Sequence, residues 1–231
     1  MKTTRFQHIP FPLFQAFAYL LALGILIFTA IMITKIVPYM HFEHATNFLG
    51  TKTDAVLYKT HFRIAFYIHI TSSIFVMGAG IFQFFPSILY RFPRFHRTIG
   101  KIYIGSILLL AAPSGLVLAT YANGGLAAKV AFSLQCLVWW VTTYFAWLEI
   151  MKGNISKHID MMLRSYAVTL AAMSLRLESY IMYYGFETKP IETYLTVTWL
   201  SWVGNLLVIE LFIYLGLGKK LLFNFQNKKI K

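Results

Sequence analysis

The chain has 231 residues, of which 58% are hydrophobic, 17% aromatic and only 13% charged, and its formal net charge is +13. Soluble domains are about 45–50% apolar and about 25% charged, so this composition excludes an ordinary soluble domain. The many aromatic residues exclude a disordered chain, and the single cysteine, Cys136, excludes a disulfide scaffold. The Lys and Arg residues form short clusters between long apolar runs, so the charge indicates membrane topology and no nucleic-acid partner.

Six apolar segments are each long enough to cross a bilayer, which takes about 20 residues of helix. They cover residues 14–37, 64–85, 102–122, 127–150, 161–184 and 194–217. The first is too long for the core of a cleaved signal peptide, which has about 7–15 residues, and no cleavage site precedes Lys35. The predicted fold is therefore all-α, an integral membrane bundle of six transmembrane helices in a single domain over residues 1–231.

The connections between these segments alternate in charge. The N-terminus, the second and fourth connections and the tail hold most of the 21 basic residues: Lys2, Arg5, Arg91, Arg94, Arg97, Lys101, Lys152, Lys157, Arg164, Lys219, Lys220, Lys228, Lys229 and Lys231. Short loops rich in Lys and Arg stay in the cytoplasm. This pattern predicts a cell-membrane protein with both termini cytoplasmic, whose basic face meets the bilayer's anionic headgroups.

Polar residues recur at helical spacing in three predicted spans and are expected to face the bundle interior, because lipid cannot satisfy them. The candidates for this polar core are His69, Gln83, Arg176, Glu178 and Asn205. An ionisable group inside a span is a functional candidate by default, and Arg176 is the strongest. The alternative is that Arg176 only caps carbonyls or pairs with another helix. Glu178 lies about 200° around the helix from it, so the two do not share a face.

A second set of candidates lies where predicted spans begin at the cytoplasmic edge. Its members are His96, Arg97, Lys101, Tyr103, His158 and Arg164, with Glu210 placed to neutralise one of these bases. Basic residues at such an edge usually fix topology and bind headgroups. The alternative is a site for phosphate or a cofactor carboxylate at two helix N-termini.

Three histidines are candidate ligands for a metal ion or haem, because neutral imidazole both ligates and titrates near neutral pH. His96 and His158 start non-consecutive spans at one depth, as bis-histidine ligation of haem requires. His69 lies in the outer layer without a second histidine, and packing or a proton relay are its other interpretations. The outer connection, residues 39–62, adds His41 and His44 with Glu43, which is too few fixed ligands to indicate a metal site.

Several motifs together resemble one family. They are His69-Ile70, Gly80-Ile81-Phe82-Gln83-Phe84, His96-Arg97-x-x-Gly100-Lys101-x-Tyr103, Trp139-Trp140, Thr142-Thr143, His158-x-x-Met161-Met162-x-Arg164-Ser165-Tyr166 and Leu175-Arg176-Leu177. The chain resembles the predicted bacterial membrane proteins catalogued as domain of unknown function 2306, over about residues 66–182. The first and last predicted spans lie outside this resemblance. The family typically has Trp in place of Met161 and often Arg in place of Lys101. The resemblance implies a helical membrane protein and no established reaction.

Several functions remain open on the sequence alone. The leading interpretation is a haem- or redox-linked membrane protein, with b-type haem or a metal ion as its cofactor. A small proton-coupled transporter or permease is the alternative, with His69, Gln83, Arg176 and Glu178 lining an outward cavity. A metal-dependent membrane hydrolase and a non-catalytic accessory protein are further possibilities. The sequence leaves open whether the protein is an enzyme and which proteins it meets.

Overall fold

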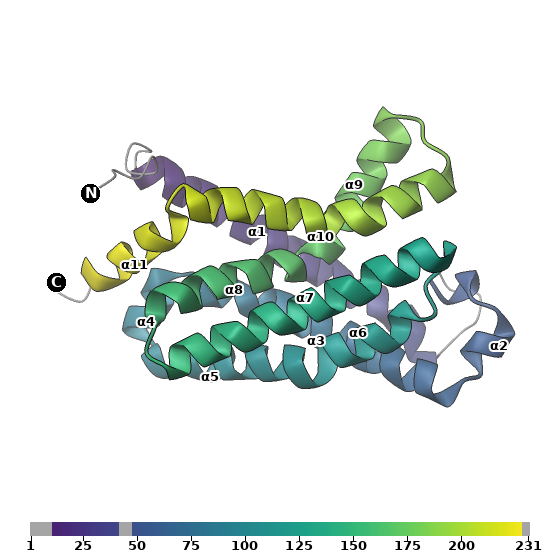
Figure 1. Cartoon of the computed structure of the whole chain (residues 1–231), viewed down its shortest axis with the longest axis horizontal. Coiled ribbons are helices and arrows are strands. Elements are labelled where there is room, and N and C mark those ends of the chain that lie inside the picture. The colour runs from purple at the N-terminus through teal and green to yellow at the C-terminus, as the bar shows by residue number, and fades with distance from the viewer. Residues whose placement is uncertain (1–10, 42–47, 228–231) are drawn as a thin grey trace.

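The structure is a computed structural model that describes residues 11–41 and 48–227, and the described residues form helices joined by short turns (Figure 1). In chain order the elements are α1 (Phe11–Ile36), η2 (Val37–His41), η3 (Leu49–Thr51), α2 (Asp54–Leu57), α3 (Thr60–Gln83), α4 (Pro86–Arg91), α5 (Pro93–Ser106), the π-helical segment η4 (Ile107–Ala111), α6 (Ala112–Ala119), α7 (Gly125–Met151), α8 (Ile155–Thr169), α9 (Ala171–Gly185), α10 (Pro190–Tyr214) and α11 (Leu217–Asn227). The all-helical prediction is therefore confirmed for the described part of the chain.

The two sets of connections lie at opposite ends of the molecule. Figure 1 shows the start of α1, α4, the turn between α7 and α8, and α11 at one end, which we call the basic pole. The helix α2 and the turns that follow α6 and α9 lie at the other end, the loop pole. The segments with most of the Lys and Arg residues thus share one pole. Its assignment to the cytoplasm stays a prediction from the positive-inside rule.

Five helices in the described ranges are long and apolar enough to cross a membrane: Tyr19–Tyr39, Thr60–Gln83, Pro93–Ala119, Gly125–Met151 and Pro190–Tyr214. They correspond to five of the six predicted spans. The remaining one, predicted as a single helix over 161–184, is instead divided between α8 and α9, which meet at Leu170. Each has 15 residues, fewer than the about 20 that cross the hydrocarbon core. Figure 1 shows α9 turning away from the direction of α8.

The junction between α8 and α9 is held by Asn205 on α10. In an uninterrupted helix the carbonyl of Ala167 would accept the N–H of residue 171. Here the side-chain amide of Asn205 donates to that carbonyl at 3.0 Å. The Oδ1 atom of Asn205 accepts the hydroxyl of Ser174 at 2.9 Å. One side chain therefore joins the end of α8 to the start of α9.

The segment η4 interrupts the third predicted span close to Pro113, which has no backbone N–H to donate. Neighbouring helices supply side-chain donors to its carbonyls. The indole N–H of Trp140 on α7 donates to Leu108 at 3.1 Å, and Nδ1 of His69 on α3 lies 2.9 Å from the carbonyl oxygen of Ala111. These bonds fix the place of His69 in the bundle.

The helices α3 and α8 approach each other closely at Gly80. A Cβ atom at this position would collide with the ring of Tyr166, whose hydroxyl donates to the carbonyl of Met77 at 3.0 Å. Glycine is therefore required here by the close contact. Gln83 lies on the same face of α3, one turn closer to the basic pole.

At the loop pole, the connection that precedes α3 is attached to the turn between α6 and α7. The ammonium of Lys52 donates to the carbonyl of Tyr121 at 2.7 Å and to Oδ1 of Asn123 at 2.9 Å. Asn123 in turn donates to the hydroxyl of Thr51 at 3.0 Å. Partial burial, with the charge of Lys129 as a smaller cause, lowers the pKa of Lys52 to about 8.

Candidate functional site

The centre of the bundle contains a network of buried hydroxyl groups. The hydroxyl of Tyr103 on α5 lies 3.1 Å from that of Ser165 and 3.0 Å from that of Thr169, both on α8. From α7, the hydroxyl of Thr143 lies 2.7 Å from Ser165, and the indole of Trp139 donates to Thr169 at 3.0 Å. All five side chains are buried. The network joins three helices and was not predicted as a unit.

Tyr103 is placed differently from the prediction. The sequence assigned it to the cytoplasmic edge, whereas its side chain is 0% exposed in the core. The reason is length: Tyr103 lies ten residues after Pro93, the start of α5, which is roughly 15 Å along a helix. Tyr103 therefore belongs to the hydroxyl network and not to the edge.

Three residues at the basic pole form a second group, which we call the basic-pole cluster: Gln83 on α3, His96 on α5 and His158 on α8. His96 is the fourth residue of α5 and His158 the fourth residue of α8, and both helices begin at the basic pole (Figure 1). Nδ1 of His158 lies 2.8 Å from the carbonyl oxygen of Ala146 on α7. Gln83 packs against α5, since its Oε1 lies 2.9 Å from where a Cβ on Gly100 would be. The structure thus brings together three predicted candidates from three helices.

Two polar atoms of this cluster lack hydrogen-bond partners among the residues that the structure describes. They are Nε2 of Gln83 and Nδ1 of His96, and both atoms are buried. The Gln83 side chain is only 8% exposed. Buried polar atoms are nearly always satisfied in proteins, so a pair of unsatisfied ones indicates a place for a bound group or water.

His69 does not join the basic-pole cluster. It lies about 21 Å along α3 from Gln83, at 1.5 Å per residue. Its ring packs beside Gly115 on α6, where Sγ of Cys136 also approaches.

Arg176 lies outside the buried core, contrary to the prediction that the polar residues of this span form one stripe facing the bundle interior. The stripe is divided at Leu170: Ser165 and Thr169 are buried on α8, whereas Arg176 and Tyr180 are exposed on α9. The guanidinium donates to the carbonyl of Ala172, one turn back on its own helix, at 2.7 Å. It also lies 5.7 Å from the ring centre of Phe28. The guanidinium thus caps a carbonyl, as the alternative proposed, and whether Arg176 also has a functional role stays a prediction.

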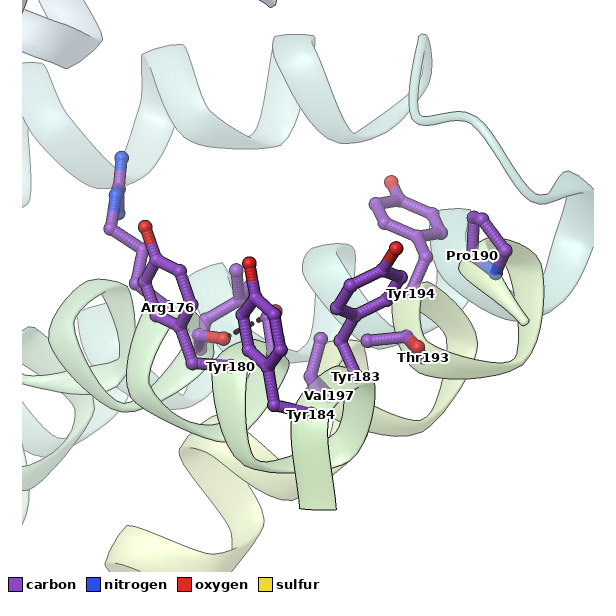
Figure 2. A pocket seen from close by; sticks show the side chains of 10 residues that line it. Arg176, Tyr180, Tyr183, Tyr184, Pro190, Thr193, Tyr194 and Val197 are labelled. Atoms are coloured by element: carbon purple, nitrogen blue, oxygen red, sulfur yellow. Dashed lines mark hydrogen bonds between the residues drawn. The ribbon is translucent and has the colours of Figure 1, made fainter. Parts of the chain in front are cut away.

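Arg176 lines an open cleft of about 470 Å³ between α9 and α10. The other lining residues are Leu175, Ser179, Tyr180, Tyr183, Tyr184, Pro190, Thr193, Tyr194 and Val197. Figure 2 shows the guanidinium and the four phenol hydroxyls directed to the same side of these helices. Glu178 is absent from this lining, and its Oε2 is buried without a hydrogen-bond partner in the described part of the chain.

The remaining edge candidates carry charge at the basic pole. Arg164 on α8 forms a two-pronged ion pair with Glu210 on α10, with 2.9 Å between Nη2 and Oε2. The prediction that Glu210 neutralises a base is therefore confirmed. Arg97 and Lys101 are exposed, one turn apart on α5, and Arg97 donates to the carbonyl of Pro93 at 3.3 Å.

A multi-ligand metal site finds no support in the described ranges 11–41 and 48–227. They contain no group of three or more His, Cys, Asp or Glu side chains that could hold a metal ion. A catalytic zinc site needs three protein ligands, as the hydrolase interpretation required. Of the loop residues predicted as a weaker possibility, Glu43 and His44 lie outside the described residues.

Comparison with known proteins gives one result. A search of curated proteins and of solved structures found no match. A family profile, described as a predicted membrane protein, matches residues 66–213. This match reaches the last membrane helix, α10, which the sequence resemblance had left outside. Because the match covers more than half of the chain, the protein belongs to the family of predicted membrane proteins designated DUF2306.

Proposed function

We propose that this chain is a redox-linked membrane protein that holds one b-type haem between His96 and His158. The observation that carries the proposal is that these two histidines come from separate helices, α5 and α8, at the basic pole, and that Nδ1 of His96 is buried without a hydrogen-bond partner in the described residues. Bis-histidine ligation requires two rings at one depth on separate helices. When bound, a haem of this kind supplies one-electron transfer.

The chemistry of the donor set fits such a group. Histidines that ligate metals usually donate their other ring N–H to a carbonyl, which fixes the tautomer and leaves Nε2 free to ligate. His158 has this arrangement through Ala146. His96 has a buried ring nitrogen without a partner in the described residues, and the amide of Gln83, which packs against Gly100 one turn along α5, is unsatisfied as well. These groups would gain partners if the site were filled.

The surroundings also fit a haem with its two carboxylates. Arg97 and Lys101 share one face of α5 and are exposed at the basic pole, where each provides a cation for a carboxylate. The ring of Phe84 next to Gln83 packs against Tyr166 with ring centres 5.2 Å apart. These aromatic groups add apolar surface near Gln83.

The test is the absorption spectrum of protein purified in detergent from haem-replete cells. We expect a Soret band that is lost in His96→Ala and in His158→Ala. His61→Ala is the matched control, because His61 lies at the loop pole beside the hydroxyl of Tyr121 and should keep the band. Size-exclusion profiles would establish that each variant is folded. If the Soret band survived in both folded variants, His96 and His158 would not be the haem ligands.

A permease is the second candidate function, and a specific feature favours it. Interrupted helices within the membrane form the substrate sites of many transporters. The break at Leu170 and the adjoining cleft with Arg176 correspond to this arrangement. Uptake by proteoliposomes that Arg176→Ala abolishes would support a permease. Absence of uptake across a panel of organic anions would argue against it.

A further inference from the structure

We infer that the cleft between α9 and α10 binds the carboxylate of a single-chain amphiphile, with Arg176 as the ligand of the head group. This inference rests on the permease candidate, for which it names the substrate class, and it is independent of the haem proposal. Binding and uptake are measured separately, so the failure of one is distinguishable from the failure of the other.

The charge of Arg176 is uncompensated in the described structure. The lining of the cleft contains no Asp or Glu, and no carboxylate among the described residues pairs with this guanidinium. The hydrogen bond to Ala172 uses one donor, whereas a guanidinium has five. A cation inside a bilayer is unfavourable, and an anion in contact with it would offset that cost.

The walls of the cleft suit an amphiphile. Tyr180 and Tyr184 stack with ring centres 6.2 Å apart, and Tyr183 meets Tyr184 edge-on at 4.9 Å. Tyrosine offers an apolar ring along its length and a hydrogen-bonding hydroxyl at its tip. Figure 2 shows these hydroxyls directed to the same side as Arg176, while Val197 and Pro190 extend the apolar wall. The cleft thus offers apolar surface for a chain and donors for its head group.

Charge balance favours a carboxylate over other head groups. One guanidinium compensates one negative charge, which a carboxylate carries. A phosphate monoester carries about −1.5 to −2 at neutral pH and would leave excess charge inside the membrane. A neutral alcohol would leave Arg176 uncompensated. The volume of about 470 Å³ lies within the range of small-molecule sites, roughly 300–1,000 Å³, and suits a single chain.

The test measures the binding of three amphiphiles to the full chain in phosphatidylcholine nanodiscs, and the binding to empty nanodiscs is subtracted. Laurate, dodecanol and dodecyl phosphate share a chain length and differ in their head groups. We expect laurate to bind about tenfold tighter than dodecanol, a difference of about 1.4 kcal/mol, and also tighter than dodecyl phosphate. Equal binding of laurate and dodecanol, or tighter binding of the phosphate, would overturn the proposal.

Variants then locate the site. Arg176→Gln keeps the size of the side chain and removes its charge, and it should abolish the preference for laurate. Arg91→Ala removes an exposed arginine of α4 at the basic pole and should leave the preference intact. A preference that survives in Arg176→Gln would contradict the inference. Laurate binding without laurate uptake would support the carboxylate-binding cleft and argue against the permease function.

Discussion

The hydroxyl groups of Tyr103, Thr143, Ser165 and Thr169 hydrogen-bond to one another where α5, α7 and α8 meet. In hydrocarbon a polar side chain cannot hydrogen-bond to water, so these groups serve as hydrogen-bond partners for one another. Each hydroxyl both donates and accepts, which allows the network to close without a charge. At the residue scale, three helices are thus held in register by neutral hydrogen bonds.

Removing the phenol hydroxyl should weaken this junction measurably. We expect Tyr103→Phe to lower the free energy of unfolding in detergent by about 1 kcal/mol, since transmembrane side-chain hydrogen bonds average about 0.6 kcal/mol each. Tyr214→Phe is the control, because that ring is 86% exposed near the end of α10. Equal stability of the wild type and Tyr103→Phe would show that the network does not stabilise the bundle.

Lys52 gives the loop pole a pH dependence. Its pKa is lowered from 10.5 to about 8. Between these values the folded chain has released a proton that the unfolded chain retains, so stability rises with pH across this window. The contribution is small, because the side chain is half-exposed. We expect the melting temperature of the wild type to rise relative to Lys52→Met between pH 8 and 10. If the melting temperatures of the wild type and Lys52→Met changed in parallel with pH, the lowered pKa of Lys52 would be contradicted.

The sequence predicted some residues of the sites and missed others for a physical reason. His96, His158 and Gln83 could be named because imidazole and amide groups are rare in apolar helices. The prediction that Glu210 neutralises one of the basic residues followed from opposite charges at the same depth, and the structure identifies Arg164 as the partner. Thr143 and Ser165 were missed as partners, because their contact depends on the rotation of α7 against α8. Hydropathy carries no information about that rotation.

At the scale of elements, the division between α8 and α9 decides which residues are buried. The sequence around Leu170 contains neither Gly nor Pro, so it gives no local sign of a break. The groups that hold the junction come from α10, through Asn205. By contrast, Pro113 is a local signal that could have marked the interruption at η4. Breaks with a local cause are therefore predictable, and those stabilised by another helix are not.

The role of Asn205 can be tested by the spread of distances between α8 and α9. With spin labels on the exposed residues Lys157 and Tyr184, we expect Asn205→Leu to broaden the distance distribution, because both bonds across the junction are lost. Ser174→Ala removes only the bond to α9 and should broaden it less. An unchanged distribution in Asn205→Leu would show that backbone geometry alone holds the bend.

For the whole molecule, the helical membrane architecture was predictable because hydropathy and loop charge act at the scale of entire helices, and the family was predictable from its residue motifs. The positions of the cleft and of Arg176 were not, since they depend on the direction in which α9 leaves α8 (Figure 1). The arrangement separates two candidate sites. His96 and His158 lie at the basic pole, and the arginine cleft lies toward the loop pole.

The sidedness of these poles can be tested by labelling single cysteines in a Cys136→Ala background with a membrane-impermeant maleimide. The positive-inside rule places the basic pole in the cytoplasm. Lys189→Cys, in the turn before α10, should then react in intact cells, and Lys157→Cys, at the start of α8, only after permeabilisation. The opposite pattern would invert the topology and place the histidine pair outside.

The most direct test of the proposed function is the haem content of the purified chain. A pyridine haemochrome assay on protein from haem-replete cells, divided by protein concentration, gives the number of haem groups per chain. The placement of His96 and His158 at the starts of two separate helices at one pole predicts one b-type haem per chain. A folded preparation that contains no haem would contradict the account.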